Sequence, residues 1–422
     1  MLQVLSSSWA LLLGIMLLMV GNGVQGTLLG IRGGIEGFST FEMSVVMSGY
    51  FAGFLFGSRM APIMIRRVGH VRVFAALGSF ISAVLILYPA LADPWAWTVL
   101  RVLIGFCFSG VYVTAESWLN NSSDNENRGK ALSLYLIVQM VGIIAAQALL
   151  VLGDPGGFIL FILPSVLVSI AFAPILLSIS PTPAFENTKG MSLRELFTIS
   201  PLGFVGIMVI GGVYSAMFGM SAVFGSQAGL TIPQLSFFVS MFYIGGLLLQ
   251  YPIGWISDRT DRRFLILVVC ALAGLASLLP IVVGPTYMMF LIAAFFIGGM
   301  INPLYALLIA YVNDLIEVED MAAASAGLVF INGIGAIAGP VVTGWMMEAF
   351  GPLGFFAYLA VLLLALLVYG TWRSTQRAAP EIDDTSSYMN VGPNMSAVVM
   401  DMAQEVWADE ANDEDATGAT QH

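Results

Sequence analysis

The chain has few residues suited to catalysis or to covalent cross-linking. It contains two cysteines and two histidines among 422 residues, and only 10% of its residues are charged. Cys107 and Cys270 both lie in apolar stretches, which argues against a disulfide framework or a zinc site. His70 falls in a predicted loop and His422 in the polar tail, so no catalytic triad or metal cluster can be assembled. We therefore expect no enzyme, no cofactor and no bound metal.

Apolar residues dominate instead, at 58% of the sequence with a mean hydropathy of +0.90, which excludes an ordinary soluble protein. Apolar runs recur that are long enough to cross a hydrocarbon core of about 30 Å, and such runs must be helical because lipid offers the backbone no hydrogen bonds. The sequence predicts an all-α polytopic membrane protein with twelve spans, at 9–31, 42–65, 72–91, 95–118, 130–152, 157–179, 201–226, 235–256, 264–284, 287–311, 322–347 and 354–372.

Basic residues alternate between the connections. Of the 15 lysines and arginines, twelve lie in or beside every second connection, whereas the intervening connections carry only Arg32. Because basic residues are retained on the cytoplasmic side of a bilayer, this pattern predicts that both termini are cytoplasmic. We expect the bacterial cytoplasmic (inner) membrane as the location.

The spans divide into two halves. We predict an N-terminal six-helix bundle at 1–179, a cytoplasmic linker at 180–200, a C-terminal six-helix bundle at 201–372 and an acidic tail at 373–422. Aligning Arg67 with Arg259 offsets the halves by 192 residues and indicates a weak internal repeat. Paired six-helix halves are a recognised transporter design in which the ligand binds near the midplane.

The loop after the eighth span resembles the G-x-x-x-D-R-x-G-R-R signature of the major facilitator superfamily, with Asp261 in place of the second glycine. The matching residues are Gly254, Asp258, Arg259, Arg262 and Arg263. The copy after the second span is poorer, since only Arg67 and Gly69 match. Arg101 and Gly105 are similar to the R-x-x-x-G element of the family's fourth span.

Three longer strings resemble the YcaD-like branch of the superfamily, which comprises bacterial inner-membrane transporters. They are Gly21–Gly26, Arg67–Arg72 and Glu116–Asn120. The resemblance implies the family's fold of two pseudo-symmetric six-helix bundles, which work by alternating access. It covers roughly residues 5–372 and leaves the tail out.

The signature loops predict a cytoplasmic latch, in which arginines bind helix C-termini and carboxylates and close one side of the molecule. Its candidate residues are Arg67, Gly69, Glu116, Arg128, Gly254, Asp258, Arg259, Arg262 and Arg263. Glu116 is a candidate partner for Arg67 or Arg128. The alternative is that these arginines only set the topology.

The family's cavity is lined by spans 1, 4, 7 and 10, and this implies six candidate substrate residues. They are Asn22, Gln25, Arg101, Tyr214, Asn302 and Tyr305. Amides in lipid also act simply as hydrogen-bonding contacts between helices. Arg101 requires a cavity or a partner, unless its side chain reaches the outer headgroups.

We expect a carrier that moves a small organic solute across the membrane, with a preference for an anionic group if Arg101 enters the cavity. Efflux of amphiphilic, drug-like compounds is the alternative, and a cavity dominated by Phe and Met would favour it. An alternative of another class is a transport-dead sensor or scaffold acting through the tail. Proton coupling is not supported because no Asp or Glu lies deep in a span, and the coupling ion stays open.

The tail carries ten acids and two arginines over residues 373–422, and its composition predicts that most of it is disordered. Met395, Val398, Val399, Met402 and Val406 recur at helical spacing, which is typical of a transient amphipathic helix or of a segment that docks on a partner or on the protein's own loops. The expected partners are the solute and the bilayer. We expect no nucleic acid and a monomer.

Overall fold

The computed structural model describes residues 2–121, 125–177, 191–316 and 318–376, together with residues 388, 391–393, 395, 396, 398 and 399. Within these ranges, side chains are described from Trp9 onward, except at 121–127, 174–177, 318, 319 and 322. Within these ranges every regular element is a helix, in agreement with the predicted fold class.

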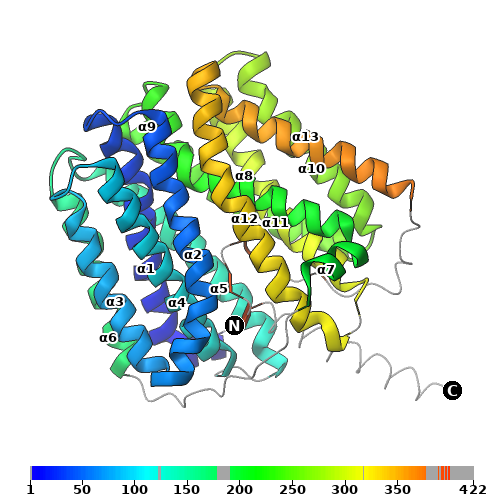
Figure 1. Cartoon of the computed structure of the whole chain (residues 1–422), viewed down its shortest axis with the longest axis horizontal. Coiled ribbons are helices and arrows are strands. Elements are labelled where there is room, and N and C mark those ends of the chain that lie inside the picture. Colours follow the sequence, from blue (N-terminus) through cyan, green and yellow to red (C-terminus); the bar gives the residue numbers. More distant parts are fainter. Residues whose placement is uncertain are drawn as a thin grey trace.

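Twelve long helices form two bundles of six (Figure 1). The first bundle contains α1 (Leu2–Ile35), α2 (Thr40–Val68), α3 (His70–Leu87), α4 (Pro94–Asn121), α5 (Asn125–Val151) and α6 (Ile159–Leu177). The second contains α8 (Pro201–Gln227), α9 (Ile232–Ser257), α10 (Arg262–Val282), α11 (Tyr287–Asn313), α12 (Val318–Phe350) and α13 (Gly354–Ser374). The short helix α7 (Leu193–Ile199) precedes the second bundle. Of the predicted linker, residues 191–200 are described and residues 180–190 lie outside the described residues.

Ten of the twelve long helices are both long and apolar enough, over their described residues, to cross a membrane. The other two are α2, which carries Glu42, Arg59, Arg66 and Arg67, and α6, whose described apolar part, Ile159–Ala173, is short. Large apolar side chains are exposed on the outside of the bundles, as a lipid-facing surface requires. We call the end that carries Arg66, Arg72 and Arg259 the basic face and the other end the opposite face.

Two turns at the basic face use the residues of the signature loops. Gly69 alone separates α2 from α3, and its φ of 88° lies in a region that disfavours any residue with a Cβ. Asp261 directly precedes α10, and its carboxylate accepts hydrogen bonds from the backbone N–H groups of Arg263 and Phe264. Asp261, which stands where the signature has glycine, therefore serves as the N-cap of α10.

One kind of close helix crossing repeats between the bundles. A Cβ on Gly53 would lie 1.8 Å from the Val102 carbonyl oxygen, where α2 crosses α4. A Cβ on Gly245 would lie 2.0 Å from the Phe295 carbonyl oxygen, where α9 crosses α11. These glycines are 192 residues apart (245 − 53 = 192), which is the offset that the sequence repeat predicts. Small residues at such crossings allow two backbones to pack closely.

The two bundles meet at the opposite face. A Cβ on Gly30 of α1 would lie 2.6 Å from the Ala222 Cβ of α8, which shows how closely these helices pack. The Ser48 hydroxyl of α2 donates to the Ile337 carbonyl oxygen of α12 over 2.6 Å. Nearer the surface, the Phe41 N–H donates to the Glu348 carboxylate over 3.0 Å. The structure is therefore closed toward the opposite face.

We predict that Gly105→Ala destabilises the protein, because the new Cβ would lie 1.9 Å from the Tyr50 carbonyl oxygen and the backbones would have to separate. Overpacking of this kind costs about 1–3 kcal/mol, and thermal unfolding of the purified protein measures it. The matched control is Gly26→Ala, whose Cβ would have its nearest neighbour at 3.7 Å and should leave stability equal or higher. Equal melting temperatures for the two variants would contradict the close crossing.

Candidate functional site

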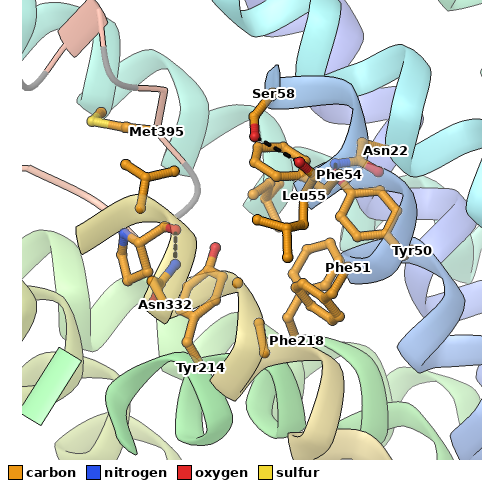
Figure 2. A pocket seen from close by; sticks show the side chains of 15 residues that line it. Asn22, Tyr50, Phe51, Phe54, Leu55, Ser58, Tyr214, Phe218, Asn332 and Met395 are labelled. Atoms are coloured by element: carbon orange, nitrogen blue, oxygen red, sulfur yellow. Dashed lines mark hydrogen bonds between the residues drawn. The ribbon is translucent and has the colours of Figure 1, made fainter. Parts of the chain in front are cut away.

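A cavity lies between the bundles (Figure 2). Its lining comes from α1, α2, α5, α8 and α12, and from two residues of the tail. The lining residues are Asn22, Tyr50, Phe51, Phe54, Leu55, Ser58, Ile143, Tyr214, Phe218, Val329, Asn332, Gly333, Ala336, Pro393 and Met395.

Aromatic rings from both bundles line this cavity. Phe218 of α8 lies at the centre of the group, with its ring centroid 5.8 Å from that of Tyr50, 6.2 Å from that of Phe51 and 6.2 Å from that of Tyr214. The Tyr214 and Phe218 rings are nearly parallel, at 10°. Aromatic rings in such arrangements can accept a further planar group by stacking or edge contact.

Two asparagines line the cavity, one from each bundle. Asn22 of α1 has its amide nitrogen 3.4 Å from the Tyr112 hydroxyl and 3.5 Å from the Tyr50 hydroxyl. Asn332 of α12 donates to the Pro393 carbonyl oxygen over 2.8 Å. The amide oxygens of both asparagines are buried and have no hydrogen-bond partner among the described residues. Such groups are uncommon in native proteins, since each costs about 1–3 kcal/mol.

Arg101 lies behind the aromatic wall and does not line the cavity. It is fully buried, it donates to the Gln25 amide oxygen over 3.0 Å, and its guanidinium lies 5.0 Å from the centre of the Tyr50 ring. Gln25 donates in turn to the Tyr88 hydroxyl over 3.2 Å. The interpretation in which Arg101 extends to the outer headgroups is therefore wrong.

The structure thus separates the six candidate cavity residues. Asn22 and Tyr214 line the cavity, and Figure 2 shows the Tyr214 hydroxyl pointing into it. Gln25 and Arg101 lie behind Tyr50 in the first bundle. Asn302 and Tyr305 are buried in α11 outside the lining, with Asn302 against Gly246 of α9. A role of these four in binding solute stays a prediction.

The candidate latch residues do not form one cluster, and several of them have partners within their own bundle. Arg262 forms a buried ion pair with Asp314, which joins α10 to the end of α11 within the second bundle. Arg259 stacks on Trp255 at 4.3 Å, and Arg263 lies 5.8 Å from the Tyr311 ring. Arg67 is exposed at the end of α2, and Arg128 is half-buried on α5. Their action as a latch stays a prediction.

Glu116, Gly254 and Asp258 contact the tail. The Glu116 carboxylate accepts hydrogen bonds from the Tyr135 hydroxyl and from Ser396, in place of an arginine. Asp258 accepts a hydrogen bond from the backbone N–H of Tyr388, whose ring lies against Gly254. The described tail residues are therefore packed against the bundles, whereas the sequence predicted that most of the tail is disordered; the other tail residues lie outside the described ones.

Sequence reasoning missed the partner of Arg262 and most of the aromatic wall. Asp314 lies three residues after the end of the tenth predicted span, and a carboxylate at that position was the available signal. Phe51, Phe54 and Phe218 had no signal that separates them from the other phenylalanines.

We predict that Asp314→Ala lowers the melting temperature by several degrees, because it removes a buried carboxylate from Arg262. In a double-mutant cycle, Asp314→Leu and Arg262→Leu should couple by roughly 0.5–3 kcal/mol. Arg259→Ala is the control, since Arg259 is exposed and its loss should change stability by less than about 0.5 kcal/mol. Strict additivity of the Leu variants would show that the ion pair contributes nothing.

Comparison with known proteins agrees with this architecture. The family model described as "Major Facilitator Superfamily" matches residues 11–236 and again 202–388. An Escherichia coli (strain UTI89 / UPEC) protein described as "Uncharacterized MFS-type transporter YcaD" is 26% identical over 368 residues, which cover 85% of this chain and 94% of that protein.

Two solved structures are similar in fold. The nucleoside transporter NupG superposes with a TM-score of 0.70 at 16% identity and covers 88% of this chain and 99% of its own. A bacterial homologue of the human lysosomal transporter Spinster, in an inward-facing and occupied conformation, has a TM-score of 0.71 at 15% identity and covers 90% and 98%. The chain therefore belongs to the Major Facilitator Superfamily, as a YcaD-like, multi-pass membrane transporter.

Proposed function

We propose that this transporter carries a small organic solute that combines a flat ring with hydrogen-bond donors, and that it does so by alternating access. The observation that carries the proposal is the pairing of an aromatic wall with two buried amide oxygens that lack partners, one on Asn22 and one on Asn332. A ring can stack against Phe218, and donors on the solute can satisfy the amides. A nucleoside has this combination of groups, and it is the substrate class named for the structural neighbour NupG.

The position of the two asparagines supports alternating access. Asn22 belongs to the first bundle and Asn332 to the second. The contacts of a solute bound to both would therefore change when one bundle rocks against the other. The basic face is the cytoplasmic one in this proposal, because basic residues are retained there. The structure is closed at the opposite face, so it represents a conformation directed to the cytoplasm.

The preference for an anionic group depended on Arg101 reaching the solute. Its guanidinium lies behind Tyr50, and the described cavity lining contains no charged side chain. An uncharged or weakly polar solute therefore fits this lining better than an anion, because a buried charge without a partner is costly. The described lining also holds no carboxylate or histidine to carry a proton, which supports facilitated diffusion or exchange, and Glu116 and Glu42, both outside the lining, remain the candidates for coupling.

Efflux of amphiphilic compounds is the second candidate. It is favoured by the large apolar share of the lining that the bundles supply, to which Phe51, Phe54 and Leu55 belong. The two candidates differ in whether the asparagines matter, since an amphiphile held by apolar contact gains little from an amide.

The test is a thermal-shift screen of the purified protein against nucleosides, small carboxylates and lipophilic cations. A ligand at 100 times its dissociation constant adds about 2.7 kcal/mol of stability. We predict that a nucleoside raises the melting temperature, and that Asn22→Leu weakens its binding about tenfold by removing one hydrogen bond. Gln147→Leu is the control, because Gln147 is a buried amide bonded to Thr27 outside the cavity lining.

Stabilisation by lipophilic cations that does not change in Asn22→Leu would favour efflux instead. If only the small carboxylates stabilise the protein, the solute is an anion, which is the preference drawn from the sequence. A nucleoside that binds equally well to Asn22→Leu would contradict the role proposed for the amide.

A further inference from the structure

The C-terminal tail enters the space between the two bundles at the basic face. Its described residues are Tyr388, Val391, Gly392, Pro393, Met395, Ser396, Val398 and Val399, which we call the tail segment. Val391, Met395 and Val399 are almost completely buried, with at most 2% of their surface exposed. Apolar side chains buried to this extent are part of the packed interior.

One end of the tail segment is held by the second bundle. The backbone N–H of Tyr388 donates to the Asp258 carboxylate over 2.7 Å. Its ring lies on Gly254, where any Cβ would come within 2.6 Å of the Tyr388 Cδ1 atom. The glycine and the aspartate of the signature loop thus both contact the tail.

The other end is held by the first bundle. The backbone N–H of Ser396 donates to one Glu116 carboxylate oxygen over 3.1 Å, and the Ser396 hydroxyl donates to the same oxygen. The Tyr135 hydroxyl donates to the other oxygen over 2.9 Å. Glu116 is fully buried, so the loss of these hydrogen bonds would leave its carboxyl oxygens without partners.

The middle of the tail segment closes the cavity. Pro393 and Met395 belong to its lining, and Figure 2 shows Met395 on the side of Asn332, across the cavity from Asn22. The Pro393 carbonyl oxygen accepts the hydrogen bond of the Asn332 amide nitrogen. A residue proposed to bind solute is therefore already engaged by the tail.

From these contacts we propose that the tail segment is an autoinhibitory plug, which occupies the solute path on the basic side and ties the two bundles together. The inference rests on the proposed transport function. Alternating access requires the bundles to rock, and a segment bonded to Asp258 on one bundle and Glu116 on the other opposes that motion. The plug must leave before the cavity exchanges solute with the basic side.

The test measures access to the cavity and needs no solute. In a background with Cys107→Ala and Cys270→Ala, Ser58→Cys places a single thiol in the cavity lining. Its rate of reaction with a water-soluble maleimide is compared between the full chain and a chain that ends at Gln376. Thr198→Cys, on the exposed side of α7, is the reference thiol.

We expect truncation to raise the labelling rate of Ser58→Cys at least tenfold and to leave Thr198→Cys unchanged. Ser396→Pro in the full chain should also raise the rate, because proline removes both the N–H and the hydroxyl that bind Glu116. Ser396→Thr keeps both donors and should label as slowly as the parent. Equal rates at Ser58→Cys with and without the tail would overturn the plug.

The same proteins separate the plug from the proposed function. If truncation opens the cavity but no nucleoside binds, the plug stands and the solute assignment fails. If a nucleoside binds, its apparent dissociation constant should tighten in the truncated chain by the factor by which labelling rises, since only the unplugged fraction binds. Binding that is identical in both chains would contradict competition between tail and solute.

Discussion

The hydrocarbon core of the membrane does not provide hydrogen bonds, and this constraint governs every level of the structure. It requires the backbone to close its own hydrogen bonds, which makes the spans helical. It also requires buried amides to find partners, and Gln25 does so between helices, with Arg101 and Tyr88. Among the described residues the amide oxygens of Asn22, Asn120, Gln147, Asn313 and Asn332 lack a partner, and only those of Asn22 and Asn332 belong to residues that line the cavity.

Close packing supplies the second constraint. Water does not drive helices together inside lipid, so association depends on how closely their surfaces fit. The glycines at the α2–α4 and α9–α11 crossings let carbonyl groups of one helix approach the backbone of the other. Both bundles use the same crossing at equivalent positions, so they share one scheme of packing.

The sequence predicts the architecture well because the relevant patterns are local. Span lengths, alternating basic loops and the 192-residue offset can each be read within a short window or by one alignment. Polar groups in apolar spans are conspicuous, and the resemblance to the superfamily implied that those of spans 1 and 7, Asn22 and Tyr214, line the cavity. The aromatic wall escaped prediction because 28 phenylalanines occur in the chain and no periodicity separates those that face the cavity. The spacing of Met395, Val398 and Val399 indicated a segment that could dock, but the contact between Ser396 and Glu116 spans 280 positions, so the docking place of the tail emerges only in three dimensions.

The central claim is that two rigid bundles expose one cavity alternately to the two sides of the membrane. Spin labels at Arg72→Cys on the first bundle and Arg259→Cys on the second would report the distance across the basic face, in the background that lacks both native cysteines. The account predicts two populations of distances whose ratio changes when a solute is added or the tail is removed. A single distance that stays the same under both treatments would contradict it.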